Sequence, residues 1–286
     1  MKILITGSNG QLGRELSMQL ENQKVDFVGY DIPEFDITDK KGIATIIDQE
    51  KPNIIINCGA LTNVDGCETS RDLAFKVNAE GPKNLAEISC EKGITLVHVS
   101  TDYVFAGDGI KEKGNIRPYI ESDPIDPKTV YGESKALGEK YVAEIADKYF
   151  IVRTAWLYGD GNNFVKTMLN LADKYPEITV VDDQIGSPTS TVDLAKAILE
   201  LIKTENYGLY HGTCEGFCSW YDFALKIFEL SGIQITVKPV TSEEFASSTP
   251  RPKYSVLENK GLNDLGLNVF RPWEKALVEY LKKLQK

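Results

Sequence analysis

Residues 2–13 read KILITGSNGQLG, a short apolar run that enters a loop with glycines three residues apart. A buried strand followed by a G-x-x-G-x-x-G turn and an amphipathic helix is typical of a dinucleotide-binding unit. In such a unit the glycines let the backbone approach the pyrophosphate, and the first N–H groups of the helix bind it. We expect cofactor contacts from Gly7, Asn9, Gly10, Gln11 and Leu12.

Strand and helix patterns alternate from this stretch to residue 154, which predicts an α/β fold with a Rossmann-type, doubly wound parallel sheet. We expect strands at 2–6, 25–30, 53–57, 94–100 and 149–154, and helices at 11–20, 40–49, 71–91 and 129–146. Beyond residue 154 the alternation loosens, with helices expected at 163–174, 190–203 and 219–231 and a strand at 178–181. We therefore divide the chain into an NAD(P)-binding domain, 1–155, and the remaining sheet elements with a smaller C-terminal substrate lobe, 156–286, interleaved at an approximate boundary.

Composition excludes several classes of protein. A formal net charge of −10 without a basic stripe argues against nucleic-acid binding. The chain has no run of roughly 18 uncharged apolar residues and no signal-peptide pattern, so we expect no membrane association and a cytoplasmic location. Its five scattered cysteines do not resemble a disulfide framework. Although His211, Cys214 and Cys218 suggest a metal, structural zinc normally takes four ligands, so we predict no metal site.

Further residues extend the cofactor site. Asp31 ends the second expected strand 18 residues after Gly13, near the offset of a ribose-binding carboxylate. Its charge disfavours a 2′-phosphate and favours NADH, but Arg14 could offset this, so NADH and NADPH both remain open. Small residues after the third strand and one side chain on the following helix are also expected to serve the cofactor: Cys58, Gly59, Ala60 and Asn78.

Tyr131 and Lys135 form the expected catalytic pair. Their i, i+4 spacing at the start of a helix places the phenol and the ammonium on one face. A tyrosine is a useful acid near neutral pH only where positive charge stabilises its phenolate, and Lys135 supplies that charge. Thr101 ends the fourth strand at the carboxyl edge of the sheet, where it could hydrogen-bond a substrate carbonyl. We predict that these three residues are catalytic and that Tyr131 and Lys135 also contact the cofactor.

Five segments together resemble the dTDP-4-dehydrorhamnose reductase family over nearly the whole chain: 6–13 (TGSNGQLG), 100–105 (STDYVF), 131–135 (YGESK), 153–158 (RTAWLY) and 251–255 (RPKYS). The resemblance implies an extended short-chain dehydrogenase that reduces dTDP-4-dehydro-L-rhamnose, a dTDP-linked 4-keto-6-deoxy sugar, to dTDP-L-rhamnose. It implies that Tyr131 is the general acid, that Lys135 holds the nicotinamide ribose and that Thr101 orients the carbonyl. Substrate contacts are then expected from Val104, Phe105, Trp156 and Arg251.

The sequence also allows other functions and structural roles. An epimerase or dehydratase of the same superfamily would share the glycine loop and the Tyr131–Lys135 pair but would keep its nicotinamide bound. A non-catalytic NADP-binding regulatory subunit would not need an intact Thr101, Tyr131 and Lys135. The polar connection 107–126 could be a flexible lid or a surface excursion. The protein could be a monomer or a homodimer.

Overall fold

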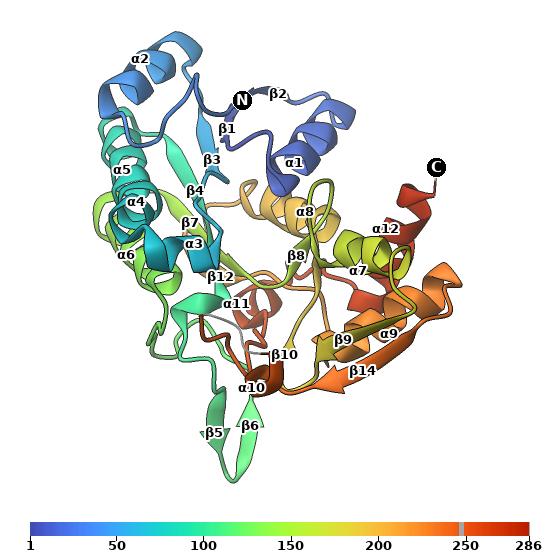
Figure 1. Ribbon diagram of the computed structural model, residues 1–286. Helices are drawn as coiled ribbons and strands as arrows, with labels where there is room; N and C mark the ends of the chain where they lie inside the picture. The colour runs from blue at the N-terminus through green and yellow to red at the C-terminus, as the bar shows by residue number, and fades with distance from the viewer. Residues whose placement is uncertain (246–248, 286) are drawn as a thin grey trace.

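The computed structural model describes residues 1–245 and 249–285. Its centre is a six-stranded sheet in the order β12-β7-β4-β3-β1-β2, and every pairing in it is parallel (Figure 1). The six strands are β1 (Lys2–Thr6), β2 (Asp26–Tyr30), β3 (Ile54–Asn57), β4 (Thr95–Thr101), β7 (Tyr149–Thr154) and β12 (Gly208–His211). The predicted Rossmann-type sheet is confirmed.

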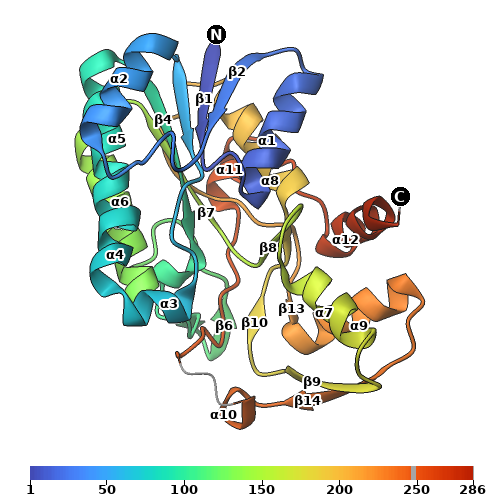
Figure 2. The same ribbon diagram turned by 45° about the horizontal axis from the view of Figure 1, so that its top comes forward.

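Alternate residues of the central strands supply two hydrophobic layers. Ile3 and Ile5 belong to one buried cluster, and Leu4 between them belongs to another, because successive strand side chains point to opposite faces. Helices cover both faces (Figure 2). The first cluster includes residues of α1 (Gln11–Asn22) and α8 (Thr191–Leu201), and the second includes residues of α2 (Lys40–Glu50), α5 (Gly81–Lys92) and α6 (Val130–Ile145).

The helix expected at 71–91 is interrupted. The segment consists of α4 (Arg71–Phe75), the π-helical turn η1 (Lys76–Glu80) and then α5. Pro82 lacks the N–H that would bond the Asn78 carbonyl in an α-helix, so the regular ladder cannot pass this point. A Cβ at Gly138 of α6 would lie 2.2 Å from that carbonyl oxygen, so α6 packs directly against the interruption. The 3.6-residue periodicity concealed this break.

After β7 the chain builds a second lobe and also returns to the main sheet through β12. The lobe contains the parallel pair β9 (Glu177–Val181) and β14 (Thr236–Val240), packed with α7 (Phe164–Ala172) and α9 (Trp220–Ser231). Shorter elements complete this half: β8 (Leu157–Tyr158), β10 (Ile185–Gly186), β11 (Thr189–Ser190), β13 (Cys218–Ser219), α10 (Ser242–Phe245), α11 (Lys260–Asp264) and α12 (Trp273–Leu284). The sequence patterns did not predict β12, β14 or α12. Within the described ranges no helix is long and apolar enough to cross a membrane.

The connection 107–126 contains an antiparallel hairpin of β5 (Ile110–Glu112) and β6 (Asn115–Arg117), which projects from the body of the molecule (Figure 1). Its base is held by the Tyr119 hydroxyl, which accepts hydrogen bonds from the N–H groups of Gly107, Asp108 and Gly109 at 3.1, 3.1 and 2.8 Å. None of these residues lines the cavity described below. The structure therefore favours a surface excursion over a lid.

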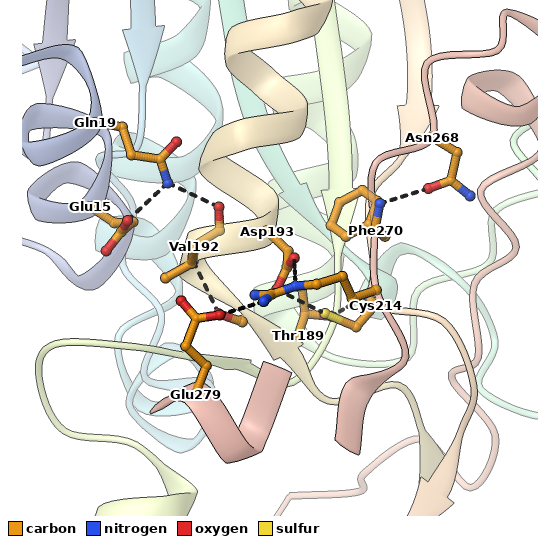
Figure 3. A network of polar contacts seen from close by, with 11 residues as sticks. Glu15, Gln19, Thr189, Val192, Asp193, Cys214, Asn268, Phe270 and Glu279 are labelled. Carbon is orange, nitrogen blue, oxygen red and sulfur yellow. Dashed lines mark hydrogen bonds and ion pairs between the residues drawn. The ribbon is translucent and has the colours of Figure 1, made fainter. Parts of the chain in front are cut away.

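A polar network ties α12 and α8 to α1 (Figure 3). Gln19 donates to Glu15 at 2.8 Å and to the Val192 carbonyl at 3.0 Å. Buried Asp193 accepts two hydrogen bonds from Arg271, at 2.7 and 2.9 Å, and Arg271 also pairs with Glu279. These contacts hold the C-terminal helix against α8, and α8 against α1.

Candidate active site

A cavity of about 850 Å³ opens at the carboxyl edge of the sheet, where β1, β3, β4 and β7 end. One side is formed by the glycine-rich loop and the first turn of α1, and the other by residues of α7, β9, α9 and the segment around Arg251. The carboxyl edge is the expected ligand site of a doubly wound sheet, because loops from several strands meet there. The volume is in the range of small-molecule and cofactor sites.

The glycine-rich loop has the close packing that a dinucleotide site requires. Gly7 has φ +64°, and a Cβ there would lie 2.8 Å from the Gly59 nitrogen. At Gly13 a Cβ would lie 2.4 Å from the Gly7 carbonyl oxygen, which prevents any larger residue at this helix–strand contact. Gly10 precedes α1, and among the described residues no side chain caps the helix start. The first N–H groups of α1 are therefore available to a phosphate, and the loop fits a bound dinucleotide.

The remaining loop residues divide between lining the cavity and bracing the loop. Gly7, Gly10, Gln11 and Leu12 line it, and the Gln11 side-chain oxygen accepts from the Gly159 N–H at 2.9 Å. Neither Asn9 nor Asp31 lines the cavity. The Asp31 carboxylate accepts from the Asn9 N–H at 2.9 Å, so it holds the loop from the end of β2. Its ribose contact stays a prediction.

Residues after β3 show the same division. Cys58 and Ala60 line the cavity, whereas Gly59 packs toward Thr6, Asn57 and Ile37.

Asn78 is fully buried, and its amide donates to the Leu61 carbonyl at 3.0 Å while its oxygen accepts from the Leu61 N–H at 2.8 Å. Its Nδ2 also donates to the Ser134 hydroxyl at 3.1 Å. Asn78 does not line the cavity, so the expected cofactor contact is wrong: its side chain braces the loop from behind.

Thr101, Tyr131 and Lys135 come together in this cavity. Thr129 caps α6 by accepting from the Gly132 N–H at 3.0 Å, which places Tyr131 and Lys135 in the first two turns. Both side chains are buried. Burial raises the pKa of Tyr131, and a smaller effect of the hydrogen bond with the Thr101 hydroxyl lowers it. Burial lowers the pKa of Lys135 to about 8. The arrangement holds a protonated phenol and a readily titrated amine beside the same space.

The segment after Thr101 corrects one expectation. The side chains of Val104 and Phe105 are 0% and 1% exposed and pack in a small core with Tyr119, so they do not shape the cavity. Asp102 and Tyr103 line it instead. The reason is the 3-10 turn η2 (Asp102–Val104), in which side chains follow a three-residue repeat rather than the alternation of a strand.

Asp102 is therefore a site residue that sequence reasoning missed. Its carboxylate accepts from the Thr101 hydroxyl at 2.8 Å, and burial raises its pKa to about 6. The sequence contained a signal for this role, because an acidic residue directly follows Thr101. A buried carboxylate needs a polar partner, and the Thr101 hydroxyl is next to it.

Trp156 lines the cavity in a constrained conformation. Its φ is +48°, which is rare for a bulky residue, and its ring stacks on Trp220 with centroids 3.5 Å apart and planes 6° apart. A Cβ at Gly186 would lie 2.3 Å from the Trp156 ring. Trp220 therefore covers one face of Trp156, a contact between residues 64 positions apart that the sequence pattern did not indicate.

Arg251 also lines the cavity, and it spans two parts of the molecule. Its Nη2 donates to Asp65 at 2.7 Å, and Asp65 lies in α3 (Val64–Thr69) of the first half. The cation is thus positioned at the cavity by a carboxylate from the opposite wall.

Comparison with known proteins agrees with this geometry. Residues 1–286 match the family described as RmlD substrate binding domain. A dTDP-4-dehydrorhamnose reductase from Clostridium acetobutylicum is 50% identical, with a TM-score of 0.96 and full coverage of both chains. The Bacillus anthracis dTDP-4-dehydrorhamnose reductase, solved in complex with NADP, is 44% identical with a TM-score of 0.93 and 99% coverage of each chain. From Streptomyces niveus, a dTDP-4-keto-6-deoxy-D-glucose reductase is 39% identical over 96% of this chain and 95% of its own.

The family match extends over the whole chain, and the similar structures superimpose over nearly all of it. The chain therefore belongs to the RmlD substrate binding domain family.

Proposed function

We propose that this protein reduces the 4-keto group of dTDP-4-dehydro-L-rhamnose to dTDP-L-rhamnose, with a hydride from NADH or NADPH, in nucleotide-sugar biosynthesis. The observation that carries the proposal is the convergence of Thr101, Tyr131 and Lys135 in the cavity that the glycine-rich loop opens into. Close relatives named dTDP-4-dehydrorhamnose reductase, one of them with NADP bound, support the same substrate and cofactor. We also propose a cytoplasmic location, since all five cysteines are free thiols.

The proposed chemistry divides between cofactor and chain. The bound dinucleotide supplies the hydride. Tyr131 donates a proton to the carbonyl oxygen as negative charge develops on it, and Thr101 hydrogen-bonds the same oxygen and orients it. Lys135, one helical turn from Tyr131, stabilises the phenolate that remains.

We assign the sugar nucleotide to the opposite wall of the cavity. Residues 1–155 would bind NAD(P)H, and 156–286 would contribute most of the substrate site. Trp156 would pack against the deoxysugar, and Arg251 would contact a sugar hydroxyl or the diphosphate. Thr101 and Asp102 line the cavity at the end of β4, so the carbonyl end of the substrate would lie there.

The direct test follows NADH and NADPH consumption with dTDP-, UDP- and GDP-linked 4-keto-6-deoxy sugars. We expect turnover with the dTDP-linked substrate, and reduction of none of these sugars would refute the proposal. The panel includes the L-rhamnose precursor and 4-keto-6-deoxy-D-glucose, because relatives of similar identity are named for each. Purified protein that already holds one equivalent of NAD would favour the epimerase or dehydratase alternative, since a reductase must exchange its cofactor at every turnover.

NADH is expected to be at least competitive with NADPH. Asp31 lies at the end of β2 with its carboxylate on the Asn9 N–H, and Arg14 is paired at 3.7 Å with Asp160. Negative charge at this position disfavours a 2′-phosphate. The measurement is kcat/KM for each cofactor with the dTDP-linked substrate. A hundredfold preference for NADPH would show that Asp31 does not act on the ribose.

Trp156→Ala is expected to raise KM for the sugar nucleotide by about tenfold, the scale of a buried aromatic contact, with little change in NADH affinity. The ring lies in the part of the cavity wall that it shares with Trp220. Trp156→Phe is the matched control and should retain more activity, because it keeps a flat apolar surface. Equal losses in substrate and NADH binding would instead indicate a structural role for Trp156.

A further inference from the structure

A buried chain of polar side chains runs from the ends of β1 and β3 across the middle of β4 to Lys135. The Thr6 hydroxyl donates to Asn57 Oδ1 at 2.6 Å, Asn57 Nδ2 lies 3.1 Å from His98 Nδ1, and His98 Nε2 lies 3.3 Å from Lys135 Nζ. All four side chains are at most 2% exposed. At such depth each donor needs an acceptor within the chain itself, because an unmatched buried polar group is costly.

The orientation of the Asn57 amide follows from its neighbours. Asn57 Oδ1 accepts from the Gly59 N–H at 3.2 Å, and a backbone N–H can only donate. Reversing the amide would place its NH₂ group against that N–H. Asn57 therefore presents a donor to His98 Nδ1, which must accept. A neutral imidazole carries one proton, so that of His98 is on Nε2.

The Nε2–H of His98 points at the amine of Lys135. An ammonium group has three donors and no acceptor, whereas an uncharged amine has a lone pair that can accept. Lys135 already donates to the Val99 carbonyl at 2.7 Å, a bond that either form can make. Two other titratable groups act on the pKa of Lys135, Glu139 on α6 and Cys58 after β3, and both raise it; Glu139 is held by two hydrogen bonds from Arg153. Burial lowers the pKa of Lys135 to about 8. The His98 Nε2–H disfavours the ammonium form, so it also acts to lower this pKa.

We propose that His98 is a positioning residue for Lys135. Thr6 and Asn57 fix the proton of His98 on Nε2, and this N–H favours the uncharged form of the Lys135 amine in the enzyme before the cofactor binds. The proposal rests on the reductase function above, in which Lys135 is cationic during proton transfer. It follows that, at pH values where the amine is uncharged in the free enzyme, Lys135 takes up a proton from solvent when NADH binds, because ribose hydroxyl oxygens offer acceptors to an ammonium. The lone pair of the amine receives that proton, and Lys135 releases it when the cofactor leaves.

The tautomer is tested in cofactor-free protein by NMR of the ring nitrogens after ¹⁵N-histidine labelling. The chain has two histidines, and the structure gives them opposite tautomers. His211 Nδ1 lies 3.1 Å from the Glu258 carbonyl, which can only accept, so His211 carries its proton on Nδ1. Burial lowers the pKa of both rings, that of His211 to about 3, so both are neutral at pH 7.

We expect one Nε2–H ring and one Nδ1–H ring at pH 7. His98→Gln and His211→Gln each remove one set of signals, so either variant assigns the spectrum. A His98 ring with its proton on Nδ1, or a charged His98 ring, would overturn the proposal.

The effect on Lys135 is tested by the pH dependence of NADH affinity, followed by nicotinamide fluorescence. Where binding takes up a proton, affinity falls by up to about tenfold per pH unit above the pKa of the free group. We expect that fall to begin near pH 8 in the wild type. His98→Leu removes the facing donor and should move the onset upward by about one pH unit, the scale of one hydrogen bond. His98→Gln should behave like wild type, because its amide can accept from Asn57 and donate to Lys135.

An unchanged onset in His98→Leu would overturn the proposal. If that variant does not fold, Asn57→Asp replaces the donor facing Nδ1 with an acceptor, which should reverse the His98 tautomer and raise the onset. A tautomer unchanged by Asn57→Asp would likewise refute the mechanism. Neither experiment requires turnover, so failure of the substrate panel and failure of this inference are separate results.

Discussion

Tyr131→Phe is expected to lower kcat by about 10²-fold or more while leaving the fold and NADH binding in place. The substitution removes one hydroxyl and keeps the ring, which is buried and packs edge-on against Tyr103 with centroids 5.4 Å apart. Hydride delivery to a carbonyl builds negative charge on oxygen, and a proton must come from a group within hydrogen-bond reach. Burial raises the pKa of Tyr131, so the phenol holds its proton at neutral pH, and positive charge on Lys135 is needed to stabilise the phenolate that donation leaves.

The measurement is kcat at saturating substrate, together with NADH affinity from fluorescence. Tyr141→Phe is the matched control, because it removes a hydroxyl from the same helix α6 outside the cavity and should not change kcat. If Tyr131→Phe retained more than about a third of wild-type kcat, this proton would not limit turnover and the assignment of Tyr131 as acid would be wrong.

Arg153→Met is expected to lower the free energy of unfolding by about 3–5 kcal/mol. Arg153 Nε and Nη2 donate to Glu139 at 2.9 and 2.7 Å, and the two side chains are only 4% and 7% exposed. Removing the guanidinium leaves a buried carboxylate without its partner, and that desolvated charge accounts for most of the loss. The measurement is the urea midpoint at an unchanged slope.

The double variant Arg153→Met/Glu139→Leu should recover most of the loss, because it replaces both charges with apolar volume. Lys203→Met is the control for an exposed pair, since Lys203 and Glu200 are 53% and 38% exposed, and it should cost less than about 1 kcal/mol. A loss below about 1 kcal/mol in Arg153→Met would contradict the prediction.

Local patterns predicted most elements of the first half of the chain. β1 and β7 have the predicted bounds, and α1, α2 and α6 differ from prediction by at most two residues at either end. Apolar periodicity and glycine spacing are local properties, and a buried parallel strand or a helix with one apolar face cannot form without them. The same patterns did not reveal the break before Pro82, where the Asn78 carbonyl of the π-helical turn packs closely against Gly138 of α6.

The sequence by itself determined the dinucleotide-binding character of this protein and the pairing of Tyr131 with Lys135. Both depend on residues close together in the chain, whose spacing sets their geometry once a strand or helix forms. Only the tertiary structure decided that Asp102 lines the cavity while Phe105 is buried, that Trp220 stacks on Trp156, and that Asn57 sets the proton position on His98. These contacts join side chains from separate strands, helices and turns. Hydrogen bonding and ring stacking require the groups to lie within a few ångströms of each other, and these groups do so only in the folded chain.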